Sequence, residues 1–88
     1  MKITLHRSYT KAFIKRISSS PKLIQKTTET IHKFQLNSHD PFLKDHALSG
    51  AKKSLRSFWV TGDYRIVYKL LSKNEAILID IGTHNQVY

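Results

Sequence analysis

The chain has 88 residues, which is enough for one small domain and too few for two independent cores. Hydrophobic residues make up 40% of it, a composition typical of a folded domain rather than of a disordered basic tail. The formal net charge is +9 and cysteine is absent, so polyanions are the expected partners, and a disulfide framework or a thiolate zinc site is excluded.

The N-terminal residues show no targeting segment. They lack the apolar stretch of a signal peptide, and no run in the chain approaches the roughly 20 apolar residues of a membrane span. We therefore expect a cytoplasmic protein without a membrane partner. Residues 2–6 alternate apolar and polar side chains, which indicates a short strand with one buried face.

Two amphipathic helices are expected next. Ser8 is a suitable N-cap for the first, which covers residues 11–18. Ser20 and Pro21 match the N-cap and first position of the second, and the turn-forming residues 37–41 end it. The two helices should form a hairpin.

The C-terminal half is rich in strand-forming residues. Residues 42–50 are expected to be a loop with a short extended piece at residues 46–48. Residues 55–60, 64–71 and 76–81 contain aromatic and branched side chains and are separated by good turn sequences, which predicts an antiparallel meander. The class is therefore α+β: one domain, residues 1–88, with an N-terminal strand and a helical hairpin packed on a small, mainly antiparallel sheet.

Alternation along the strands suggests which side chains meet. Ile77, Ile79 and Ile81 form an apolar face that the helices should cover. His84 then falls on the opposite side, and Arg65 lies on the polar face of its own strand. We expect Arg65 and His84 to meet on the uncovered, concave side of the sheet.

Residues 48–50, 55–60 and 62–68 read Leu-Ser-Gly, Leu-Arg-Ser-Phe-Trp-Val and Gly-Asp-Tyr-Arg-Ile-Val-Tyr. This succession of a leucine-glycine turn, a strand and a "G-D-Y-R-I-V-Y" strand resembles the sheet of toxins of the RelE and ParE superfamily. The order of strand, helix and helix before it agrees too, as does the C-terminal strand. The resemblance covers essentially the whole chain.

Residues 45–48, Asp-His-Ala-Leu, and residues 82–88, Gly-Thr-His-Asn-Gln-Val-Tyr, resemble the "D-H-P-L" and terminal "G-T-H-S-D-L-F" segments of the YafQ branch. Toxins of that branch cut messenger RNA on the ribosome. The resemblance implies catalytic roles for His46, Asp63, His84 and Tyr88. Arg65 matches a catalytic arginine of RelE, and Trp59 stands where YafQ toxins have a further histidine.

Cleavage of RNA by this route requires a base for the 2′-hydroxyl, an acid for the leaving oxygen and cations for the phosphate. Histidine suits both proton transfers near neutral pH. We expect His46 and His84 to perform them, in an order the sequence leaves open. Arg65 would stabilise the phosphate, Asp63 would orient a histidine, and the Tyr88 ring would stack on a base.

Further basic and aromatic side chains are candidates for binding RNA, with a solvated basic loop or a core tryptophan as the alternatives. They are Lys44, Lys52, Lys53, Arg56 and Trp59. The remaining histidines have no motif around them, so we expect neither a metal nor another cofactor.

The resemblance also implies the partners. They are an antitoxin with an acidic toxin-binding segment, messenger RNA in the ribosomal A site, and ribosomal RNA. Two alternatives stay open: a ParE-like toxin that inhibits gyrase by binding, and an inactive family member that only binds its antitoxin.

Overall fold

The fold is described from a computed structural model that covers all residues from Met1 to Tyr88. Its regular elements are β1 (Lys2–Leu5), α1 (Arg7–Arg16), α2 (Pro21–Leu36), β2 (His46–Ala47), β3 (Arg56–Trp59), β4 (Tyr64–Ser72), β5 (Glu75–Thr83) and α3 (His84–Val87). Single turns of 3-10 helix, Pro41–Leu43 and Gly50–Lys52, lie on either side of β2. The expected order of elements is confirmed, and α3 is an addition that the sequence patterns did not predict.

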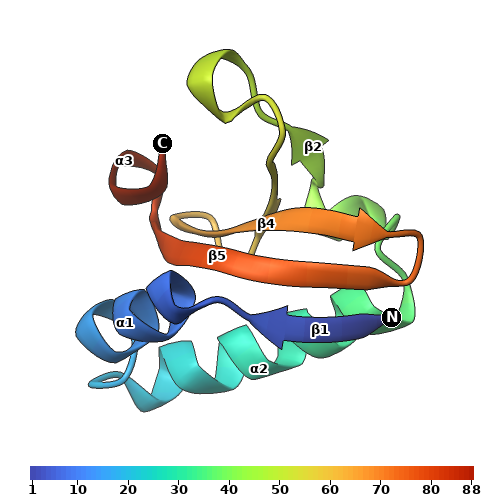
Figure 1. The fold of residues 1–88 in the computed structure, drawn as a ribbon. Coiled ribbons are helices and arrows are strands. Elements are labelled where there is room, and N and C mark those ends of the chain that lie inside the picture. Colours follow the sequence, from blue (N-terminus) through green and yellow to red (C-terminus); the bar gives the residue numbers. More distant parts are fainter.

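The strands form one sheet in the order β1-β5-β4-β3-β2. β1 is parallel to β5, and all other neighbours are antiparallel. α2 lies across one face of the sheet, and α3 and the turn Gly50–Lys52 stand on the other (Figure 1). The α+β class is confirmed. None of the helices combines the length and apolar character needed to cross a membrane.

The helix starts follow from local hydrogen bonds. Ser20 caps α2 as expected, because its hydroxyl accepts from the backbone N–H of Leu23. The expected cap at Ser8 is wrong: α1 begins earlier, and the His6 side chain accepts from the N–H of Ser8 at 3.0 Å. The Ser8 hydroxyl instead donates to the carbonyl of Ile79 at 2.5 Å, which ties α1 to β5.

An aromatic cluster forms the centre of the core between α2 and the sheet. The rings of Phe34 and Phe58 stack with centroids 4.5 Å apart, and Tyr68 meets Phe34 edge-on at 4.8 Å. All three residues are fully or almost fully buried. This face of the sheet is closed by apolar packing.

The expected core face of the last strand is partly wrong. Ile81 is fully buried, but Leu78 belongs to the core in place of Ile77 and Ile79, which are only partly buried. The reason is a bulge: Val67 pairs with Asp80 and Tyr68 with Leu78, so Ile79 has no partner. One extra residue reverses the alternation along β5.

Candidate active site

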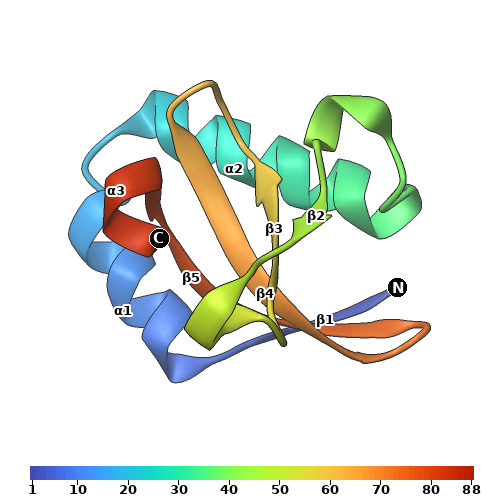
Figure 2. The same ribbon diagram turned by 90° about the horizontal axis from the view of Figure 1, so that it is seen from above.

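A hollow lies between α3 and the loop around β2, on the sheet face opposite α2. The loop and α3 rise on the same side of the sheet (Figure 1), and Figure 2 views this face from above. The cavity measures about 340 Å³ and is lined by His46, Ala47, Leu48, Ser49, Lys52, His84 and Tyr88. Three of the five predicted catalytic residues therefore lie together.

Backbone contacts hold α3 in this position. The N–H of Thr83 donates to Oε1 of Gln86 at 2.8 Å, and the N–H of His84 donates to the carbonyl of Asp63 at 3.2 Å. A Cβ at Gly82 would lie 2.7 Å from the same Gln86 oxygen, so a larger residue there would require the end of the Gln86 side chain to move. The conformation of residues 82–86 thus brings His84 to the hollow.

The Tyr88 ring stands between the two histidines. Its centroid is 4.5 Å from that of His84 and 6.4 Å from that of His46, and both contacts are edge-on. The Tyr88 hydroxyl donates to Oγ of the fully buried Ser57 at 2.5 Å. Ser57 is a site residue that the sequence patterns missed, since a single serine in a strand has no motif. Its position opposite His46 in the β2–β3 pairing becomes evident only from the sheet register.

The contacts of His46 define its neutral tautomer. Nδ1 lies 2.9 Å from the carbonyl oxygen of Lys44. A carbonyl oxygen can only accept a hydrogen bond, so Nδ1 carries the proton. Nε2 then keeps its lone pair and is free to accept a proton from a ligand.

The neighbouring residue, Asp45, is fixed on the opposite face of the sheet. The Tyr68 hydroxyl lies 2.8 Å from both carboxylate oxygens, and Nε of Arg56 lies 3.3 Å from one of them. Burial, followed by the hydrogen bond to Asp45 and its charge, raises the pKa of Tyr68. This network tethers the segment that carries His46.

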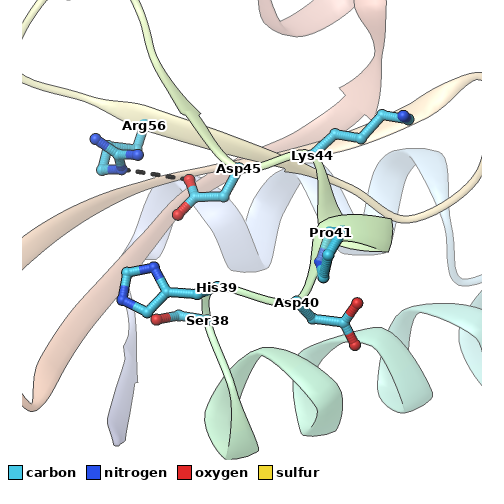
Figure 3. Close-up of a pocket in the computed structure, with 7 residues that line it drawn as sticks. All are labelled: Ser38, His39, Asp40, Pro41, Lys44, Asp45 and Arg56. Carbon is cyan, nitrogen blue, oxygen red and sulfur yellow. Dashed lines mark hydrogen bonds and ion pairs between the residues drawn. The ribbon is translucent and has the colours of Figure 1, made fainter.

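Arg56 therefore does not line the hollow, although we predicted that it binds RNA. It borders a separate pocket of about 180 Å³ together with His39 and Asp45, as Figure 3 shows. The alternation along β3 explains the difference, because Ser57 faces the hollow and Arg56 the other side. Burial alone would lower the pKa of Arg56, but the hydrogen bond to Tyr68 and the charge of Asp45 outweigh it and raise the pKa.

Arg65 is a buried cation without an acidic partner. The residue is 7% exposed, and no carboxylate lies within 4.0 Å of its guanidinium. Nη1 donates to the carbonyls of Thr61 and Tyr64 at 2.9 and 3.2 Å, and the guanidinium carbon lies 4.0 Å from the centroid of the Trp59 ring. Nζ of Lys44 lies 5.2 Å from the same centroid. Trp59 thus contacts two cations.

Arg65 and His84, which we expected to meet, are not joined by a hydrogen bond between their side chains. Arg65 pairs with Gly82, two residues before His84. The exposed carboxylate of Asp63 makes no hydrogen bond to a histidine either, and only its backbone carbonyl contacts His84. Asp63 supports the start of α3 through its main chain.

The two loop lysines differ. Nζ of Lys52 donates to the carbonyl of Val87, so this lysine joins the loop to α3 and closes one side of the hollow. Lys53 is exposed and is not part of the lining. No three His, Cys, Asp or Glu side chains cluster closely enough to hold a metal ion.

The hollow therefore combines two histidines, a tyrosine ring and a lysine. One histidine has a free lone pair, and the site lies on the same sheet face as a buried, unpaired arginine. These groups suit proton transfer at a ligand that carries negative charge.

No protein-family model matches the sequence, and no curated protein matches it either. Solved structures do match. A copper-bound mutant toxin from Helicobacter pylori is 29% identical, with a TM-score of 0.72 over 100% of this chain and 99% of that one. A conserved hypothetical protein from the same organism is 28% identical, with a TM-score of 0.78 over the same shares of the two chains.

YafQ from Escherichia coli, solved as a single-residue mutant, is 23% identical, with a TM-score of 0.78 over 99% of this chain and 97% of that one. A YoeB/ParE toxin from Agrobacterium tumefaciens matches at 17% identity with a TM-score of 0.76, covering 96% and 99% of the two chains. These likenesses extend over the full length of the fold. The chain therefore has the fold of these toxins and is similar in structure to YafQ and to the YoeB/ParE toxin.

Proposed function

We propose that the chain is the toxin of a type II toxin–antitoxin pair and that it is a ribosome-dependent endoribonuclease that cuts messenger RNA during translation. One observation carries the proposal: His46 from β2 and His84 from α3 flank the Tyr88 ring in a single hollow. The net charge of +9 supports a polyanionic substrate.

In this proposal the two histidines divide the proton transfers. Nε2 of His46 takes the proton of the 2′-hydroxyl, whose oxygen attacks the adjacent phosphorus. The bond to the 5′-oxygen breaks, and His84 gives that oxygen a proton. The products are a 2′,3′-cyclic phosphate and a 5′-hydroxyl end. The free lone pair on His46 favours it as the base, and a placed acid or base is typically worth about 100-fold to 10,000-fold in rate.

Arg65 is assigned to the phosphate. A buried cation without a carboxylate is costly, and an incoming phosphate would compensate its charge. Arg65 lies two residues before Val67 on β4, and Val67 pairs with Ser57, which accepts the hydrogen bond from Tyr88. Arg65 therefore lies about 7 Å along the strand from the level of Ser57. Trp59 orients the guanidinium, and the partly exposed Tyr88 ring is the surface left for stacking on a base.

The proposed partners follow from charge and from the neighbours. YafQ has been solved in a toxin–antitoxin complex with DinJ. We expect this chain to be held silent by an antitoxin with an acidic segment and, when released, to bind messenger RNA in the ribosomal A site together with ribosomal RNA. Such a toxin would act in the cytoplasm.

The test is induction in bacteria of the wild type, His84→Ala and the control His32→Ala, followed by mapping of messenger RNA ends. His32 is an exposed histidine of α2 outside the hollow. Wild type and control should cut messages within translated codons and stop protein synthesis. The His84 variant should lose cutting by about 100-fold or more.

Two results would contradict the proposal. Growth arrest with intact messages would favour a toxin that acts by binding, as in the ParE-like alternative. Full cleavage by His84→Ala would show that the hollow is not the active site. Absence of both arrest and cleavage, in a wild-type chain that still binds an antitoxin, would indicate an inactive relative.

A further inference from the structure

A groove between α1 and β5 lies beyond α3 from the hollow. It measures about 440 Å³ and is lined by Ser8, Lys11, Ala12, Lys15, Arg16, Ile79 and Asp80. We propose that this groove binds phosphates of the same single-stranded RNA whose scissile bond lies in the hollow. This proposal rests on the function proposed for the chain. The groove would hold nucleotides that flank the cleaved position.

The register places the hollow and the groove on one face of the sheet. His46 pairs with Ser57, Ser57 with Val67, and Val67 with Asp80. Paired residues of neighbouring strands point to the same face, and three steps of about 4.8 Å separate the ends of this row by about 14 Å. His46 lines the hollow and Asp80 lines the groove. A few nucleotides of extended RNA span that distance.

α3 borders the hollow and lies close to one side chain of the groove. His84 and Tyr88 face the hollow. On the other side, the position that a Cβ of Gly82 would take is 2.7 Å from Oε1 of Gln86 and 2.8 Å from Nη1 of Arg16, which lines the groove. An RNA strand leaving the hollow therefore has a single helical turn to cross.

The charges of the groove are uncompensated. Lys11 and Lys15 are exposed, stand four residues apart on α1, and have no carboxylate within 4.0 Å. Like charges at this spacing repel each other and weaken the helix. The one acidic residue of the groove, Asp80, already pairs with Arg16 at 3.2 Å. The two lysines are thus free for an anion.

The lining favours a phosphate chain over a peptide. Among the groove residues only Ala12 and Ile79 are apolar. A docked peptide depends on pockets for apolar anchors, whereas RNA backbone binding depends on cations and releases counterions. Continuity with the hollow on the same face also favours the strand that is being cut.

The experiment measures RNA binding against salt concentration by fluorescence anisotropy, in His84→Ala so that no RNA is cut. Lys11→Gln/Lys15→Gln should reduce the slope of log K against log salt by about 1.4 for a nonanucleotide, since each phosphate contact to single strands contributes about 0.7. The slope for a trinucleotide, which fills only the hollow, should stay the same. The control Lys22→Gln/Lys26→Gln removes the same charge at the same spacing from α2 and should leave both slopes unchanged.

Equal losses of slope in the two double variants would show that the effect depends only on net charge, and this would overturn the proposal. An unchanged slope for the nonanucleotide in Lys11→Gln/Lys15→Gln would overturn it as well. A loss of slope confined to the binding of a nonaglutamate peptide would also overturn the proposal, because it would assign the groove to an acidic protein. These slopes are independent of cleavage in cells, so a failure of the groove and a failure of the proposed function are distinguishable.

Discussion

Phe58 and Ser57 are neighbours on β3, and both are completely buried, but on opposite faces of the sheet. Phe58 stacks on Phe34 among apolar side chains, whereas Ser57 accepts a hydrogen bond from Tyr88 beside two histidines. The face toward α2 is closed by shape and contributes stability. On the open face, polar contacts hold reactive side chains in place. Removing these contacts should affect activity more than folding.

The largest expected effect on stability belongs to the closed face. Phe58→Ala should lower the free energy of unfolding by about 3–5 kcal/mol, because it removes a buried ring and leaves a cavity beside Phe34. Urea denaturation measures the change. Phe42→Ala is the matched control, since Phe42 is 87% exposed and should have little effect. Similar losses in the two variants would show that the aromatic cluster is not the centre of the core.

The open face should show the opposite behaviour at Arg65. Arg65→Met should reduce RNA cleavage by about 100-fold to 1,000-fold, because the phosphate loses its cation. The free energy of unfolding should change by no more than about 1 kcal/mol, since the variant also removes an unpaired buried charge. Lys69→Met, on the exposed part of β4, is the control. Severe unfolding of Arg65→Met with normal cleavage per folded molecule would assign Arg65 to structure.

The sequence predicts much of the difference between the two faces of the sheet. The periodic positions of α1 and α2, the Ser20-Pro21 start and the residues 62–68 predict the order of elements and the polar face of β4. The pairing of His46 with the C-terminal segment came from the resemblance of residues 45–48 and 82–88, since spacing alone does not bring them together.

Other features follow from contacts that leave no pattern in the sequence. α3 is a single turn, too short for periodicity, and depends on the close approach of Gln86 to Gly82. The bulge at Ile79 reverses the alternation of β5 without any local signal, so the expected core face is correct for Ile81 and wrong for Ile77 and Ile79. Asp45 has its role only because Tyr68, far along the chain, reaches both carboxylate oxygens.

The Asp45 tether links the two faces, and alkaline pH should weaken it. An unfolded tyrosine ionises near pH ~10, whereas the raised pKa of Tyr68 keeps the folded state protonated at that pH. The folded state therefore binds more protons above about pH 10, and the free energy of unfolding should fall as pH rises, by at most about 1.4 kcal/mol per pH unit for one tyrosine. Urea denaturation across this range should show a shallower fall in Tyr68→Phe. Tyr9→Phe is the comparison variant. Burial also raises the pKa of Tyr9 to about 12, but Tyr9 makes no hydrogen bond to Asp45, so this variant measures the effect of burial alone.

The smallest expected effect concerns the hydrogen bond between Ser57 and Tyr88. Tyr88→Phe keeps the ring between the histidines and removes only the hydroxyl, so stability should fall by about 1 kcal/mol and cleavage by several-fold at most. Ser57→Ala should behave similarly, and the double variant should lose little more than either single one, since both remove the same bond. Tyr88→Ala removes the ring itself and should lose far more cleavage. Additive losses from the two conservative substitutions would mean that the hydroxyl and the serine act separately, with the Tyr88 hydroxyl contacting RNA. A cleavage loss in Tyr88→Phe as large as in Tyr88→Ala would make that hydroxyl, rather than the ring, the group that the open face holds in place.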